Sequence, residues 1–397
     1  MAPKTKSTSR RRFLQHSALG LIGSSLFVRT LGLSAMTGSA QLSAQSDDFK
    51  ALVYIFLDGG NDSYNMIVPQ GSGSLRQRNE DGRGNIALAA DDLHSLSISN
   101  TPTIFGGEDY SEFGMHPACG DIAGMFNSAQ LSVVCNVGSL AEPTTRAQYL
   151  EQSVTLPPRL FSHADQQRQF QSEPLDPFRY GWGGRLAELL THYNTGGLVS
   201  PLISVSGLNS FQVTRDSLIN TYVMNSTGAV TLEGLDSNRE AMLDSYFQSL
   251  SSSSHMMEQK YKEVFLSGQT AVEIMTSAFD LAEAGGVDYD EIFAATGAAG
   301  TNSGEQLKTV AKMIAGREAS ANQRPVYFVK LNGFDTHQNV LADHEALMSD
   351  LDAALSAFRT ALVEQGDFDK TLSFVGSEFG RTFTPNGSNS SAGTDHA

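Results

Sequence analysis

The sequence is poor in cysteine, in long apolar runs and in positive charge. Its two cysteines, Cys119 and Cys135, are too few for a disulfide scaffold or a four-cysteine zinc site. Beyond the N-terminal region no apolar run reaches the roughly 20 residues of a membrane helix, so we expect no stable membrane span. The formal net charge is −16. Because so acidic a surface repels nucleic acid, we expect no nucleic-acid partner.

Three common catalytic signatures are also missing. Residues 58–62 (Asp-Gly-Gly-Asn-Asp) fit neither the G-x-G-x-x-G dinucleotide fingerprint nor the G-x-x-x-x-G-K-[ST] phosphate loop. No G-x-S-x-G nucleophile elbow occurs. Hydrophobic residues nevertheless make up 40% of the chain, which is enough for a sizeable core, so a wholly disordered chain is not expected.

Residues 1–40 look like an export signal. Arg11 and Arg12 precede Phe-Leu, an apolar stretch covers residues 18–28, and small residues gather near Ala40. This order resembles a twin-arginine signal peptide, which implies transport by the twin-arginine translocase and a periplasmic or extracellular bacterial location. The alternative is an arginine-rich tail ahead of a buried helix.

Strand and helix patterns alternate along the rest of the chain. Five short apolar or β-branched runs predict strands at residues 51–57, 131–137, 201–205, 326–331 and 371–375. They are continuous rather than alternating, which is typical of a sheet buried on both faces. Helical patterns occur at residues 117–128, 183–193, 304–314 and 341–364. We therefore expect one α/β domain over residues 47–397, with a doubly wound, mostly parallel sheet and helices on both faces.

Two segments interrupt this alternation. Residues 70–107 are rich in glycine, serine, asparagine and aspartate, which predicts a long surface excursion. Residues 236–285 are strongly helical, and we expect a helical hairpin inserted in or capping the domain.

If residues 117–128 and 131–137 form an antiparallel helix–strand pair, a Cys119–Cys135 disulfide could form after export; two separate buried thiols are the alternative.

Carboxylates and imidazoles follow three of the predicted strands and recur close to residue 397. They are Asp58, Asp62, Asp335, His337, Glu378, Asp395 and His396. In a parallel sheet these segments share one edge. So many carboxylates repel one another, and one or two divalent metals (Zn, Mn, Mg or Ca) would relieve the repulsion. We therefore expect a metal site at this edge.

Each motif alone also has an ordinary structural explanation. Residues 58–62 could be a turn, and residues 335–337 an Asx-capped loop. Glu378 could simply pair with Arg381, and residues 395–396 could belong to a ragged tail.

Two further histidines matter. His163 lies in a polar cluster where Ser162 could cap a short helix. His344 sits in a helical pattern and is expected to be solvated.

Taken in order, the motifs resemble the bacterial domain-of-unknown-function family 1501. The matching segments are Phe56-Leu-Asp-Gly-Gly-Asn-Asp62, Phe161-Ser-His163, Gly333-Phe-Asp-Thr-His337, Ser377-Glu-Phe-Gly-Arg381 and Gly393-Thr-Asp-His396. The resemblance covers roughly residue 49 to the end. That family is placed in the alkaline phosphatase and sulfatase superfamily, which implies an alkaline phosphatase-like sandwich with two metals at its edge.

The resemblance implies ligand roles. Asp62, or Asp58, resembles the first-strand metal ligand. Asp335 and His337 resemble a ligand pair, although their spacing is Asp-x-His instead of Asp-x-x-x-His. Glu378 stands where the superfamily often has an Asp-His pair, with Phe379 in place of the imidazole. His396 resembles the late histidine ligand.

The resemblance also implies a reaction. Ser162 resembles a metal-activated nucleophile, and Arg381 would steady anionic oxygens. Together these imply an exported metal-dependent hydrolase acting on a small anionic phosphate or sulfate ester. The alternatives are a non-catalytic binding or assembly protein of the same fold, and a purely structural metal site. Family members continue past the Gly-Thr-Asp-His motif, so we expect this chain to be truncated at its C-terminus.

Overall fold

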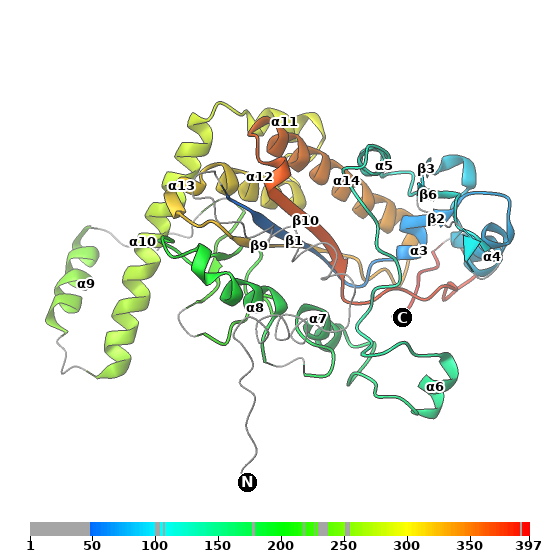
Figure 1. The fold of residues 1–397 in the computed structure, drawn as a ribbon, viewed down its shortest axis with the longest axis horizontal. Coiled ribbons are helices and arrows are strands. Elements are labelled where there is room, and N and C mark those ends of the chain that lie inside the picture. The colour runs from blue at the N-terminus through cyan, green and yellow to red at the C-terminus, as the bar shows by residue number, and fades with distance from the viewer. Residues whose placement is uncertain are drawn as a thin grey trace, which may run out of the picture.

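A parallel five-stranded sheet lies between two layers of helices (Figure 1). The computed structural model describes residues 48–397 except 100–103, 106–107, 177–178, 217–218, 227, 229–236, 251–254 and 390. The expected export signal at residues 1–40 lies outside the described residues. The strand order is β10-β1-β9-β7-β8, and every pairing is parallel. The strands are β1 (Ala51–Asp58), β7 (Leu202–Ser204), β8 (Tyr222–Val223), β9 (Val326–Asn332) and β10 (Thr371–Ser377).

Strand β1 is buried on both faces, as its continuous apolar run predicts. Val53 and Ile55 point into one core, and Tyr54 and Phe56 into the other. The first face is covered by α5 (Gly120–Asn127), α10 (Met256–Ala284), α11 (Tyr289–Ala295), α12 (Asn302–Ala315) and α14 (Val340–Glu364). The second face is covered by α7 (His163–Gln171) and α8 (Trp182–Leu189). An α/β fold with a parallel sheet flanked by helices is thereby confirmed.

One predicted strand is wrong. Four predicted strands correspond to β1, β7, β9 and β10, but residues 131–137 form neither helix nor strand and are mostly exposed. A β-branched run makes a strand only where a sheet edge is free to pair with it, and this segment pairs with neither β10 nor β8. Consequently Cys119 is buried, Cys135 is exposed, and both are free. Neither the disulfide nor a pair of buried thiols is present.

The expected surface excursion is folded into a small lobe. It contains α4 (Ser74–Arg83), the 3-10 turns η2 (Gly84–Ile86) and η3 (Ala90–Asp92), and the short strands β4 (Ile104–Phe105) and β5 (Glu108–Asp109). A second sheet, in the order β2-β6-β3, joins it to the body through β2 (Ile67–Pro69), β6 (Phe113–Met115) and β3 (His94–Ser95). The helix α3 (Ser63–Met66) leads from β1 into this lobe.

Two helices occupy the segment where we expected a helical hairpin. They are α9 (Ser237–Ser249) and α10. The second half of α10 buries Ala271, Met275 and Ala278 against α12 and α13 (Arg317–Ser320). Its first half and α9 stand away from the body (Figure 1). Within the described residues, no helix is long and apolar enough to cross a membrane.

Three short elements complete the described part of the chain. They are α6 (Arg146–Glu151), η4 (Thr191–Tyr193) and η5 (Phe368–Lys370).

Candidate metal centre

The candidate site forms where β1, β9 and β10 end. Strand β1 pairs with both neighbours, so Leu57 lies beside Ser377 and Asp58 beside Asn332. The chain then turns at Gly59, whose φ is 126°. A Cβ on Gly59 would lie 2.3 Å from the backbone nitrogen of Asp335. Only glycine therefore allows the loop after β1 to touch the loop after β9.

The C-terminal segment returns to the same edge. Arg381 and His396 form an antiparallel bridge, and the Thr394 backbone N–H donates to the Thr336 carbonyl at 3.0 Å. A Cβ on Gly393 would lie 2.1 Å from the His337 carbonyl carbon, so the two backbones touch directly. This contact places the end of the chain beside the loop that carries Asp335.

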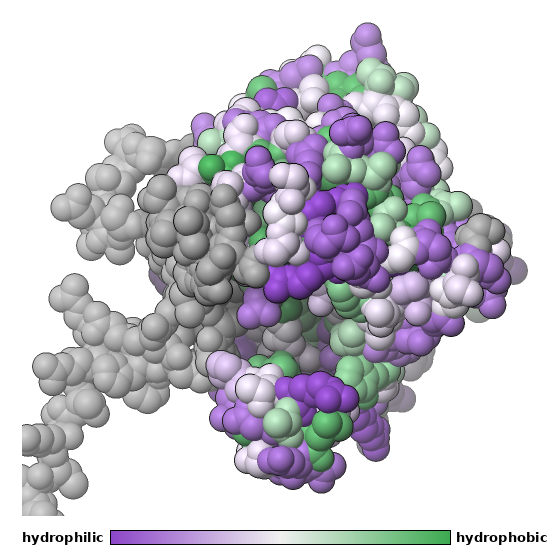
Figure 2. Space-filling model, turned by 90° about the vertical axis from the view of Figure 1, so that its right-hand side faces the viewer, coloured by the Kyte–Doolittle hydropathy of each residue, from purple (hydrophilic) through white to green (hydrophobic). Residues whose placement is uncertain are grey.

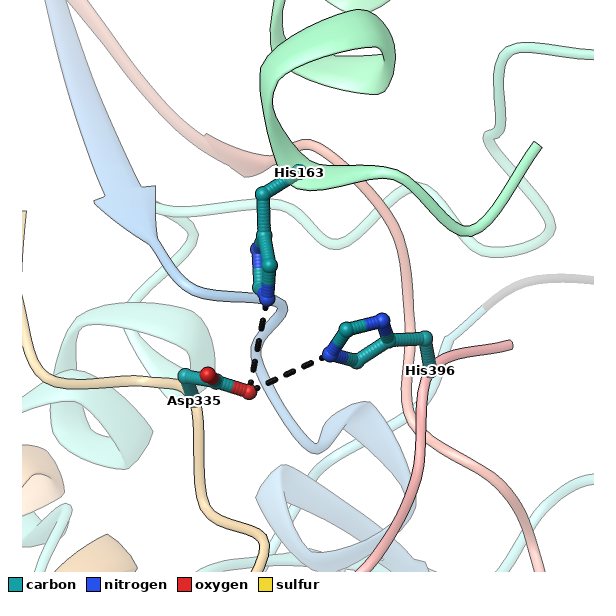
Figure 3. Close-up of side chains that lie close together, drawn as sticks. All are labelled: His163, Asp335 and His396. Carbon is teal, nitrogen blue, oxygen red and sulfur yellow. Dashed lines mark hydrogen bonds and ion pairs between the residues drawn. The ribbon is translucent and has the colours of Figure 1, made fainter. Parts of the chain in front are cut away.

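Asp335 is the centre of the site. Figure 3 shows its carboxylate between His163, at the start of α7, and His396, near the C-terminus. Asp335 Oδ1 lies 3.4 Å from His163 Nε2 and 3.3 Å from His396 Nε2. It also lies 2.9 Å from His337 Nε2 and 2.8 Å from Arg381 Nη1. Three imidazoles from three separate parts of the chain thus converge on one carboxylate oxygen.

Each of these imidazoles has an oxygen beside its other ring nitrogen. The Nδ1 partners are Glu378 Oε1 for His163 at 2.9 Å, the Phe161 carbonyl for His396 at 2.9 Å, and Asp395 Oδ1 for His337 at 3.2 Å. A carbonyl or an ionised carboxylate only accepts, so in the neutral rings Nδ1 carries the hydrogen. All three Nε2 lone pairs then face Asp335, and the Nε2 atoms of His337 and His396 also lie only 2.9 Å from each other.

This arrangement fits a bound metal ion. Lone pairs facing a carboxylate oxygen repel it unless a cation or a proton lies between them, and His163 Nε2 is buried with no hydrogen-bond partner. The ligand atoms of His163, Asp335 and His396 lie within 4.8 Å of one another. In a tetrahedral zinc site, ligands at about 2.0–2.1 Å from the ion stand about 3.3 Å apart. The His163–Asp335 and His396–Asp335 separations match that spacing, so these residues form a candidate metal-binding triad.

Electrostatics keep Asp335 ready to act as a ligand. Burial alone would raise its pKa. The hydrogen bond from Arg381 and the neighbouring imidazoles outweigh burial, and the pKa of Asp335 lies below its ordinary value. Arg381 itself is fully buried; its guanidinium also donates to the Thr394 hydroxyl at 3.2 Å and to the Gly59 carbonyl at 3.3 Å. Arg381 therefore holds Asp335, and it does not pair with Glu378.

Three of the expected site residues lie outside this group: Asp58, Asp62 and Ser162. Asp58 Oδ2 pairs with Lys330 Nζ at 3.0 Å. Asp62 forms a fully buried ion pair with Arg83, and burial raises its pKa against the lowering effect of that arginine.

The hydroxyl of Ser162 also points elsewhere. It donates to Asp165 Oδ2 at 2.8 Å. Ser162 occupies the N-cap position of α7 without making a side-chain cap hydrogen bond.

The sequence analysis singled out His163 without predicting it as a metal ligand, and its prediction for His344 is wrong. His163 stood out only as part of the Phe-Ser-His cluster, because nothing in the sequence shows that α7 begins beside the loop after β9. His344, expected to be solvated, is buried, and its Nε2 lies 3.0 Å from Asn61 Oδ1. Gln167, which contacts both Asp58 and Glu378, also had no sequence signal.

Comparison with protein families agrees with the motifs. The model of the family described as "Protein of unknown function (DUF1501)" matches residues 49–397. The chain belongs to this family. No curated protein and no solved structure matches the chain. The family description assigns no activity, so function has to be argued from the site.

Proposed function

We propose that this chain is an exported, metal-dependent hydrolase of phosphate or sulfate esters. The observation that carries the proposal is the convergence of three imidazoles on Asp335 at the carboxyl edge of a parallel sheet. The side chains of Asp335 and His337 are 46% and 43% exposed. Structural metal sites are closed, whereas catalytic sites keep one position open to solvent and substrate. This exposure favours catalysis over a purely structural metal.

The chain's own residues would bind and orient the metal. His163, Asp335 and His396 would hold it, with His337 as a fourth neighbour. The imidazoles favour Zn, whereas the carboxylate of Asp335 also suits Mn, Mg or Ca. When bound, such a metal polarises an ester oxygen and lowers the pKa of water.

The partners behind these ligands set their directions. Glu378 holds the Nδ1 hydrogen of His163, and Asp395 holds that of His337, which aims both Nε2 lone pairs inward. Arg381 fixes the carboxylate of Asp335. We assign Arg381 this positioning role because its guanidinium is buried and already bonded.

The ester class rests on the resemblance to the alkaline phosphatase and sulfatase superfamily, which the parallel sheet supports. Ser162 is the candidate nucleophile on the same resemblance, and its hydroxyl would have to turn from Asp165 to face Asp335. The Ser162 hydroxyl donates its hydrogen to Asp165 Oδ2. Asp165 is therefore placed to accept the proton that Ser162 gives up. Export through the twin-arginine translocase is proposed from residues 1–40.

Metal analysis and ester hydrolysis test the proposal together. We expect about one equivalent of Zn or Mn per chain, lost in Asp335→Ala and in His163→Ala, with hydrolysis of 4-nitrophenyl phosphate or sulfate reduced about 100-fold or more. Asp350→Ala, an exposed aspartate on α14, should keep both properties. A folded chain that binds no metal would refute the site. Metal binding without turnover of any ester would leave a binding or structural protein.

A further inference from the structure

An open surface pocket, lined mainly by apolar residue types, lies between α6 and the segment that leads into α7. Its volume is about 430 Å³, and it is lined by Tyr149, Leu150, Gln152, Leu156, Pro157 and Leu160. A cavity of about 150 Å³ is enough to bind benzene. This pocket therefore has room for an aromatic group or for a medium-length alkyl chain.

Phe161 links the wall of this pocket to the candidate metal centre. Leu160 lines the pocket, and the ring of Phe161 packs edge-to-face on Tyr149 with 6.2 Å between centroids. The carbonyl of Phe161 accepts the hydrogen bond from His396 Nδ1 at 2.9 Å. Two residues further on, His163 begins α7. Residues 160–163 thus line the pocket through Leu160, orient His396 through the Phe161 carbonyl, and contribute His163.

The backbone of this segment is held in a conformation that side chains rarely adopt. Gln152, Arg159 and Phe161 have φ values of 50°, 55° and 71°. For a bulky residue such as phenylalanine this is an outlier, and such outliers cluster at binding sites. A capping box between Thr145 and Gln148 fixes the start of α6. These features fix the course of the chain on both sides of the pocket.

Apolar side chains remain exposed around this pocket. Leu150 is 62% exposed, and Tyr149 and Phe161 are also exposed. Figure 2 faces the side of the molecule on which α4 and α6 lie, and shows a lower lobe with apolar patches, separated from the body by a hollow. An exposed apolar surface beside a polar site is typical of a ligand-binding groove.

We propose that this pocket receives the apolar group of the ester, so that the substrates are monoesters of aryl or medium-chain alkyl alcohols. The proposal rests on the proposed hydrolase function. The anionic group lies at the metal centre, and the apolar group extends past Phe161 into the pocket. A fully buried methylene improves transfer from water about fourfold, so chain length sets the preference among substrates.

Binding of non-hydrolysable probes tests the pocket without relying on turnover. The affinities of methylphosphonate and n-octylphosphonate, and of the matching sulfonates, are measured by calorimetry on the full chain. We expect the octyl probe to bind at least about tenfold more tightly than the methyl probe. Leu156→Ser and Leu160→Ser should bring the ratio of the octyl-probe affinity to the methyl-probe affinity close to one. Leu208→Ser, at a leucine that is 84% exposed outside the pocket, should leave it unchanged, with circular dichroism confirming that each variant is folded.

The outcomes separate this inference from the function on which it rests. An unchanged chain-length preference in both pocket variants would overturn the inference that this pocket binds the apolar group. If wild-type protein hydrolyses methyl and octyl esters equally well, the pocket inference fails and the hydrolase stands. If the octyl preference persists in wild type and in Asp335→Ala but no ester is hydrolysed, the hydrolase fails and the pocket remains a site for apolar anions.

Discussion

At the scale of single residues, Glu378 orients the imidazole of His163, a candidate metal ligand. Its carboxylate is fully buried, lies 2.9 Å from His163 Nδ1 and accepts the Gly59 backbone N–H at 2.9 Å. A carboxylate behind a histidine fixes the tautomer and makes the opposite nitrogen a stronger ligand. The sequence predicts Glu378 as a ligand, but its carboxylate lies behind His163, so its charge should act through that imidazole.

Replacing Glu378 by glutamine isolates that charge. Gln keeps an oxygen for His163 and Gly59 and can donate to the Ser377 hydroxyl, which lies 3.1 Å from Glu378 Oε2. We expect the Kd for Zn²⁺ to rise about 10- to 100-fold, measured by competition with a chromophoric chelator. Glu345→Gln, on the exposed face of α14, is the matched control. Equal Kd values for the two variants would show that Glu378 does not support the ligand.

Single residues also show what the sequence can predict of this site. Asp335 and His337 follow a strand of a parallel sheet, so the rule for carboxyl edges was enough to identify them. Asp62 follows a strand equally closely, yet it is paired with Arg83. Only the fold of α4 brings that arginine to it. Along the sequence His163 lies far from any strand end, and only the packing of α7 brings it to this edge.

At the scale of elements, burial decides which local patterns become structure. Strands β1 and β9 have apolar runs and lie at the centre of the sheet, with a neighbour on each side. Residues 131–137 have a similar local composition but no partner strand. Strand pairing is a property of the whole fold, so local propensity alone could not separate these cases.

The C-terminal segment gives a test at the same scale. Gly393→Ala would force the segment away from His337, because its Cβ would lie 2.1 Å from a backbone carbon. Since this segment carries His396, we expect metal affinity to fall at least about tenfold, while circular dichroism shows the helices intact. Gly387→Ala in the same segment meets only ordinary contacts, the nearest at 3.8 Å, and should bind metal normally. Normal affinity in both variants would mean that the end of the chain is not part of the site.

At the scale of the whole molecule, histidines buried near the candidate metal centre tie stability to pH. His116 and His344 lie edge-to-face with 5.3 Å between ring centroids. Burial, aided by His116 and Arg83, lowers the pKa of His344 to about 3. Burial, aided by His94, lowers the pKa of His116 to about 4. Helical spacing could have shown the burial of His344, because it lies four residues before Met348 and seven before Leu351 and shares their buried face.

Because the pKa values of both histidines are lowered, acid destabilises the folded protein. An unfolded histidine titrates near about pH 6.5. Below that pH the unfolded chain binds protons that the folded chain excludes until the pH reaches about 4 for His116 and about 3 for His344. The free energy of unfolding therefore falls as the pH falls, by up to about 1.4 kcal/mol per pH unit for each histidine. Above about pH 6.5 both histidines are neutral in both states, and their contribution is fully present.

His344→Gln should remove one of these two contributions. Glutamine can still donate to Asn61 Oδ1 but does not titrate, so the free energy of unfolding should depend less steeply on pH. We expect the slope between about pH 6.5 and 4.5 to decrease by up to about 1.4 kcal/mol per pH unit. Urea unfolding in the presence of a chelator measures it. His255→Gln, at an exposed N-cap, controls for loss of a solvated histidine. A slope in His344→Gln equal to that of wild type would show that His344 is protonated in the folded protein, and that the buried polar layer holds a charge.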